Sequence, residues 1–300
     1  MTEGLHEISF GTYAHGILQT QYEHLVHQEA AVLADEDPEP LHKMRVSCRR
    51  LRTALQVFAP VVILPPALSG KRVRDIAQIL GELRDLDVQM DGLEGYYRPQ
   101  LEAEDQPQIH QLGTVLQKYR RKGLSRTSAV LAGSRYRKLK KACETWLAQP
   151  VYTPLATRTL FPLVPYLLSP LLARLVLHPG WFLTGATEED HVLHDLRKEL
   201  KHARYQAEFL TPFYGEDFSR WLETVKKLQD VLGTIQDAQV LSNVLTREFP
   251  DHQESRLAQL VAERRVAALE EWDRLRLPFL NPEDLLALTR RVAHPNPTTA

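Results

Sequence analysis

Two segments of this chain each carry four basic side chains at the same spacings, which are three, four and three residues. On an α-helix such steps place all four side chains on one narrow face. Cations this close repel one another, so a face without interspersed acids is typical of a site for an external anion. Arginine binds two phosphate oxygens at once and lysine adds a point charge, which favours a phosphate-rich ligand. These residues are His42, Arg45, Arg49 and Arg52 in one segment and His194, Arg197, Lys201 and Arg204 in the other.

The basic face of each segment lies directly beside an apolar face. Helical periodicity predicts that the apolar face packs into the core and that the basic face is half-buried at its edge. Each histidine leads its stripe, where the ring could donate a hydrogen bond or become charged beside a phosphate. The predicted core faces are Leu41, Met44, Cys48, Leu51, Leu55 and Phe58, and then Leu193, Leu196, Leu200, Ala203, Ala207 and Leu210.

A structural interpretation stays open beside the binding one. Carboxylates on neighbouring helices, such as Asp85, Asp87 and Asp237, could pair with the basic stripe and hold it in a salt-bridge network. The basic run at 118–141 is likewise open to two interpretations, a solvated helix face or an extension of an anion track.

The two segments belong to a longer duplication with an offset of 152 residues. The offset carries Leu80-Gly81 onto Leu232-Gly233 and Asp85 onto Asp237. It also relates Arg74 to Lys226, which makes both second-tier candidates for the same anion site. The chain is therefore expected to consist of two similar halves.

Helical signals dominate the chain and strand signals are nearly absent, which predicts an all-α protein. Prolines 150 and 154 mark the boundary between a first half, 1–150, and a second half, 151–300. Each half then holds four helices, which predicts a pair of related four-helix bundles. The helices are expected at about 13–33, 41–58, 69–93 and 106–147 (with possible breaks near Gly123 and Gly133), then at about 155–178, 188–210, 216–247 and 251–276, with a short one at 282–292.

Composition narrows the class of protein. The net charge is −1, but residues 1–42 hold no Lys or Arg and residues 106–143 hold no Asp or Glu, so a local positive field is compatible with this average. Two cysteines make neither a disulfide framework nor a zinc site and fit a reducing compartment. The N-terminus lacks the pattern of a signal peptide, and the apolar stretch 160–177 holds three prolines and Arg174, so we expect a buried, broken helix and a cytoplasmic protein without a membrane span.

Motifs for catalysis are missing from the sequence. There is no Walker-type loop, HExxH, CxxC pair or GxSxG, so neither an enzyme nor a metal or cofactor site is expected. A phosphotransferase or polyphosphatase that uses His42 or His194 is the less favoured alternative. A nucleic-acid-binding protein is the main alternative, although aromatic side chains for base stacking are sparse among the basic residues.

The four segments LHKMRVSCRRLRTALQVF, LGELRDLDV, LHDLRKELKHARYQAEFL and LGTIQDAQVL resemble the CHAD domain, the conserved-histidine α-helical domain, over nearly the whole chain. The resemblance implies two four-helix bundles related by a pseudo-twofold axis, with a basic groove or cavity between them. It implies inorganic polyphosphate as the ligand, binding without catalysis, possible targeting to polyphosphate granules, and a stand-alone copy of the domain.

Carried onto this chain, the family pattern assigns the eight stripe residues to polyphosphate. It adds Arg84, whose counterpart in the second half is Gln236. Because Asp87 likewise becomes Gln239, the second copy is expected to contribute fewer or different contacts. A protein partner cannot be named from the sequence.

Overall fold

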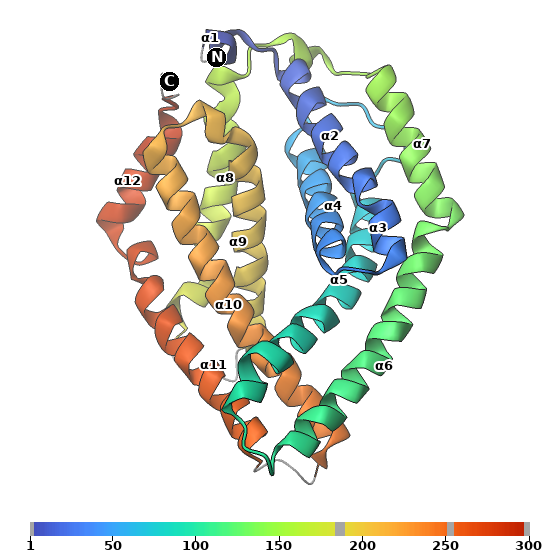
Figure 1. Cartoon of the computed structure of the whole chain (residues 1–300). Coiled ribbons are helices and arrows are strands. Elements are labelled where there is room, and N and C mark those ends of the chain that lie inside the picture. The colour runs from blue at the N-terminus through green and yellow to red at the C-terminus, as the bar shows by residue number, and fades with distance from the viewer. Residues whose placement is uncertain (1–2, 184–189, 251–254, 297–300) are drawn as a thin grey trace. The chain divides into compact units, whose positions relative to one another are not determined.

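The computed structural model describes residues 3–183, 190–250 and 255–296, and Figure 1 shows that these residues form helices joined by short connections. Apart from two isolated bridges, Ser9 with Thr159 and Val62 with Tyr152, the described residues form no β-structure. The predicted all-α class is therefore confirmed. The pseudo-twofold relation and the basic groove between the halves stay predictions.

The chain divides into two compact units. One comprises residues 7–100 and 107–160, and the other comprises 161–300 with the short segments 1–6 and 101–106. The division at 160 lies ten residues beyond the boundary placed at 150 from the sequence. Residues beyond Pro150 stay with the first unit because Ile63 N–H donates to Val151 O at 2.9 Å and Thr153 N–H donates to Val61 O at 3.0 Å.

The helices of the first unit follow the predicted order, and two of the predicted helices are broken in their interior. The predicted helix at 13–33 is interrupted at Gln28, where α2 ends and α3 begins. The predicted helix at 106–147 breaks at Gly133, whereas Gly123 stays helical and packs closely against Leu83 of the neighbouring helix. The helices are α2 (Phe10–His27), α3 (Glu29–Ala34), α4 (Glu39–Val57), α5 (Gly70–Gly92), α6 (Gln106–Leu131) and α7 (Ser134–Ala148). The short α1 (Glu3–Glu7) precedes them in the chain and belongs almost entirely to the other unit.

The predicted helix at 155–178, which spans the division between the two units, differs most from the structure at its start. Residues 154–157 and 161–163 are short 3₁₀ turns, and a regular helix begins only at Val164. This helix continues through Pro170 and buries one face, while Tyr166 and Leu177 are exposed, so the expectation of a buried helix holds for one face only. The helices are α8 (Val164–Val176), α9 (Asp190–Leu210), α10 (Glu216–Glu248), α11 (Arg256–Leu275) and α12 (Pro282–Ala293).

The predicted starts of two helices of the second unit, 188–189 and 251–254, lie outside the described residues. None of the described helices combines the length and the apolar composition needed to cross a membrane.

The two helices that carry the basic stripes are central to their own units. Helix α4 packs against α2 and α5, and α9 packs against α8 and α10. All twelve residues of the predicted core faces are buried. Burial of one large aliphatic or aromatic side chain contributes about 1.5–3 kcal/mol, so each apolar face fixes the rotation of its helix. The basic stripe is thereby held at the edge of the core.

Candidate anion-binding site

The structure places all eight stripe residues at intermediate exposure. This confirms the half-buried position predicted from the helical periodicity. It follows directly from the buried apolar faces, because a residue next to a buried stripe on a helix sits at the rim of the core. The charged groups are thus partly removed from water but remain within reach of a ligand.

A glycine on the neighbouring helix makes room for one arginine of each stripe. A Cβ atom on Gly81 of α5 would lie 3.3 Å from Nε of Arg45. In the second unit, a Cβ atom on Gly233 of α10 would lie 3.4 Å from a terminal nitrogen of Arg197. The same guanidinium-over-glycine contact therefore occurs at positions 152 residues apart. It gives a physical reason for the repeated Leu-Gly pair that the sequence shows.

His42 lies in the first turns of α4, close to other cations. Asp37 accepts a hydrogen bond from Glu39 N–H at 2.8 Å, which helps to set the start of the helix. Burial lowers the pKa of His42, and the positive charges of Arg84 and Arg45 lower it further, against the opposing effect of Glu39. Nε of Arg84 is buried and has no hydrogen-bond acceptor among the described residues.

The C-terminal end of the first stripe is also crowded with positive charge. Burial lowers the pKa of Arg52, and the nearby charge of Arg74 lowers it further. Arg74 is exposed and lies 3.7 Å from its sequence neighbour Asp75. The structure therefore brings Arg74 of α5 close to the stripe on α4.

Carboxylates contact part of the stripe, as the structural interpretation anticipated. Arg45 lies 3.5 Å from Asp85, whose side chain is 67% exposed, so this is a weak surface pair. In the second unit Arg204 lies 3.1 Å from Glu208, one turn further along the same helix, a partner that the sequence reasoning missed. The Nε of Arg204 is buried without an acceptor among the described residues.

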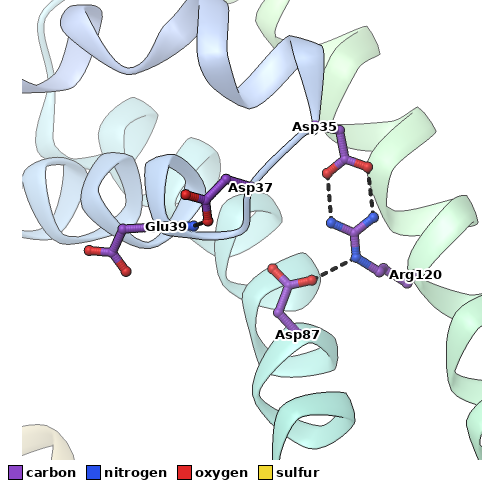
Figure 2. Close-up of polar contacts among 5 residues, drawn as sticks. All are labelled: Asp35, Asp37, Glu39, Asp87 and Arg120. Atoms are coloured by element: carbon purple, nitrogen blue, oxygen red, sulfur yellow. Dashed lines mark hydrogen bonds and ion pairs between the residues drawn. The ribbon is translucent and has the colours of Figure 1, made fainter.

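Asp87 does not pair with an arginine of the basic stripe. It forms an ion pair with Arg120 of α6 instead. Figure 2 shows Arg120 donating two hydrogen bonds to Asp35, at 2.6 and 2.7 Å, and one to Asp87 at 2.7 Å. Asp35 ends α3 in the left-handed conformation with φ 53°, which Asp tolerates better than most residues. The contact ties the connection before α4 to both α5 and α6.

Part of the basic run at 118–141 is therefore used inside the unit. Besides Arg120, Lys140 lies 2.8 Å from Glu29, and Arg126 lies 3.0 Å from Glu82. The Arg120–Asp35 and Lys140–Glu29 pairs join the acid-rich N-terminal segment to the basic helices α6 and α7. The interpretation of the whole run as an anion track is weakened accordingly.

The second copy has glutamines, Gln236 and Gln239, where the first has Arg84 and Asp87. Burial lowers the pKa of His194, the charges of Lys198 and Arg197 lower it further, and a polar contact with Gln236 opposes them. A pocket of about 220 Å³ lies beside the ring and is lined by Gln236 and Gln239, the counterparts of Arg84 and Asp87. The expected difference between the copies is thus present in the residues around His194.

Lys226 is exposed and 4.0 Å from Glu223 on its own helix.

Within the described part of the chain, no group of three or more His, Cys, Asp or Glu side chains is placed to hold a metal ion. Cys48 and Cys143 are both buried and free. Burial raises the pKa of each thiol to about 12, so neither is poised as a nucleophile.

Comparison with known proteins assigns the fold to a family. The model of the CHAD domain matches residues 16–246, a span that includes both basic stripes. The chain belongs to the CHAD domain family. No curated protein sequence matches this CHAD protein.

Two solved structures resemble it over almost their whole length. The CHAD domain from the plant Ricinus communis is 24% identical, with a TM-score of 0.67 over 97% of this chain and 94% of that one. PptA from Streptomyces chartreusis is 16% identical, with a TM-score of 0.61 over 95% of this chain and 98% of that one. At these identities the similarity concerns the fold.

Proposed function

We propose that this CHAD protein binds inorganic polyphosphate through the basic faces of α4 and α9 and does not turn it over. The observation that carries the proposal is the crowding of half-buried cations in the first unit. Burial lowers the pKa of His42 and of Arg52, and the positive charges of Arg84 and Arg45 beside His42 and of Arg74 beside Arg52 lower these pKa values further. Such crowding is unfavourable in the free protein, and a bound polyanion would relieve it.

The spacing of the groups suits an extended ligand. Arg52 lies ten positions after His42, which corresponds to about 15 Å along a helix. Charges therefore follow one another along α4, with Arg84 and Arg74 of α5 beside the two ends. A polyphosphate has a charge on every repeat unit and can meet each group in turn. A single orthophosphate would meet only one or two of them.

The face of α9 would bind the same ligand less strongly. It repeats the histidine and three cations, but Gln236 replaces the arginine that accompanies His42 in the first unit. Glu208 also offsets part of the charge of Arg204. We therefore expect the first unit to contribute more of the affinity.

Binding should be measured by calorimetry with long-chain polyphosphate at two salt concentrations. Neutralised phosphates release counterions, so affinity should fall steeply with salt, by analogy with DNA binding. RNA and DNA serve as competitors, and released orthophosphate reports any turnover. Equal displacement by RNA would favour a nucleic-acid-binding protein, and sustained orthophosphate release would favour an enzyme.

The decisive variant is Arg49→Glu combined with Lys201→Glu, which reverses one charge in the middle of each stripe. Polyphosphate binding should be lost while the helical circular dichroism spectrum is retained. The matched control is Lys118→Glu with Lys122→Glu, which makes the same change of charge at two exposed positions of α6. A folded Arg49→Glu/Lys201→Glu protein that binds with unchanged affinity would refute the proposal.

Polyphosphate binding would also give the protein a place in the cell. A fluorescent fusion should collect at polyphosphate granules in the cytoplasm, and the Arg49→Glu/Lys201→Glu variant should stay diffuse. Granule localisation of that variant would show that another surface directs it there.

A further inference from the structure

A second candidate binding site lies in the first unit, on a surface that polyphosphate binding does not use. It is a groove of about 600 Å³ between the connection from α4 to α5 and one face of α7. We propose that this groove binds a small amphipathic anion, a molecule with an apolar body and a carboxylate or phosphate head. The residues that argue for it are Ile63, Trp146 and Val151 on the walls and Arg72, Lys138 and Lys141 around them.

Hydrogen bonds across the groove hold its walls at a fixed separation. Ile63 N–H donates to Val151 O at 2.9 Å, so the α4–α5 connection is joined to the segment after α7. The indole N–H of Trp146 donates to Ile63 O at 3.0 Å, which joins the same connection to α7. The groove is therefore formed before any ligand arrives, as is usual for small-molecule sites.

The walls of the groove expose apolar surface to water. The side chains of Ile63 and Val151 are 51% and 52% exposed, although both lie in segments whose backbones are hydrogen-bonded to each other. Leu64, Pro65 and Ala142 add further apolar atoms, and the buried ring of Trp146 completes the lining. Covering this surface would be favoured by about 25 cal/mol for every Å² of apolar area removed from water.

The charges around the groove are all positive. Arg72 lies in the first turn of α5, while Lys138 and Lys141 lie on α7. No carboxylate is among the lining residues, and within the described ranges none of the three cations is paired with an acid. An occupant of complementary chemistry therefore carries negative charge at one end and apolar groups at the other.

The groove is distinct from the polyphosphate surface of the same unit. Arg72 and Arg74 are two residues apart on α5, so their side chains leave the helix about 200° apart. The charge of Arg74 lowers the pKa of Arg52 in the basic stripe, whereas Arg72 lines the groove. A bare polyphosphate would also gain nothing from the apolar walls, because it would lose hydration without polar partners there.

The size of the groove favours a small molecule. Its volume lies within the range of about 300–1,000 Å³ that is typical of ligand sites. The combination of apolar walls with a few charged groups is likewise typical of such sites. This proposal is independent of the polyphosphate proposal, and each can fail without the other.

The test uses the full chain and three probes with the same eight-carbon body: octanoate, octyl phosphate and uncharged octanol. Calorimetry should detect binding of both anions and binding of octanol that is weaker by roughly tenfold, the contribution of one or two charge-assisted contacts. Lys138→Glu combined with Lys141→Glu should abolish binding of the anions. Ala142→Phe should weaken all three probes because it fills the groove.

Two control variants test whether a loss of octanoate binding is specific to the groove. One makes the same change of total charge elsewhere, and the other alters the basic stripe. Lys118→Glu with Lys122→Glu makes the same charge change at exposed positions of α6 and should bind octanoate normally. Arg49→Glu/Lys201→Glu should also bind octanoate normally. If Ala142→Phe does not fold, the Lys138→Glu/Lys141→Glu variant and the octanol comparison decide.

Three results would overturn the proposal: no binding of either anion, equal binding of octanoate and octanol, or displacement of octanoate by long-chain polyphosphate. The last result would make the groove part of the polyanion surface. An acidic peptide that displaces octanoate would instead show that a protein partner uses the groove.

Discussion

Replacement of Arg120 by leucine should destabilise the first unit by about 3 kcal/mol. Arg120 is the shared partner of Asp35 and Asp87, as Figure 2 shows. The side chain of Asp87 is only 4% exposed, whereas that of Asp35 is 22% exposed. Without the guanidinium, Asp35 can turn toward water, but Asp87 is left as a buried charge without its cation.

The magnitude follows from this asymmetry. Removal of one partner from a buried ion pair typically destabilises a protein by about 3–5 kcal/mol, because the remaining charge is not solvated. We take the lower end of that range, since only one of the two aspartates is deeply buried. Replacing Arg120 and Asp87 together by leucine should recover most of the loss, because no charge then stays buried beneath Asp35.

The pH dependence gives the reasoning a second check. Burial raises the pKa of Asp87 and outweighs the lowering effect of the Arg120 hydrogen bond. Loss of Arg120 removes that lowering effect, so the pKa rises further above its value in the unfolded chain. The folded variant then takes up a proton on Asp87 at a higher pH than the unfolded chain does, so its destabilisation should shrink as the pH falls from neutral toward about 4, the ordinary pKa of Asp.

The assay is urea unfolding followed by far-ultraviolet circular dichroism, with wild type and variant compared at each pH. Lys118→Leu, an exposed position on the same helix, should change stability by less than about 0.5 kcal/mol. A loss below about 1 kcal/mol for Arg120→Leu would contradict the buried-charge argument. So would a loss that stays constant with pH.

Three further predictions concern the basic stripes and the core. Burial lowers the pKa of His42 and His194 in the free protein, whereas a bound phosphate would raise it. Polyphosphate affinity should therefore increase from about pH 8 to about pH 6. Replacing both histidines by Gln should flatten the pH profile of affinity measured by calorimetry. Gly81→Ala should leave thermal stability equal or higher, because Ala favours the helix by about 0.5–1 kcal/mol. The same substitution should weaken polyphosphate binding, because the added Cβ would lie 3.3 Å from Nε of Arg45. Unchanged affinity would argue against a role for that contact. Cys48 and Cys143 should not react with a thiol reagent in the folded protein and should react fully in urea, and fast labelling without urea would show that the core opens.

The sequence by itself determined the helical class, the order of the helices and the faces that they bury. These properties depend on hydrophobic periodicity and on the positions of proline and glycine, all of which are local. The half-buried position of His42 and its seven companions followed for the same reason, because the apolar residues of α4 and α9 fix the rotation of each helix. The repeated Leu-Gly pair was visible as a pattern, but its reason, a guanidinium lying over Gly81 and over Gly233, needed the packed helices.

Only the tertiary structure decided which charges are used up inside the protein. Arg120 looks like any other member of a basic run in the sequence, yet it is held by Asp35 and Asp87, which lie 85 and 33 residues away. The groove beside Trp146 is likewise formed by segments distant in sequence, and its cations carry no local signal that marks them as neighbours. Local sequence patterns predict whether a helical side chain is buried or exposed, because the fixed period of the helix decides which residues share the apolar face. They do not predict its partner, because a partner is chosen by how whole helices pack.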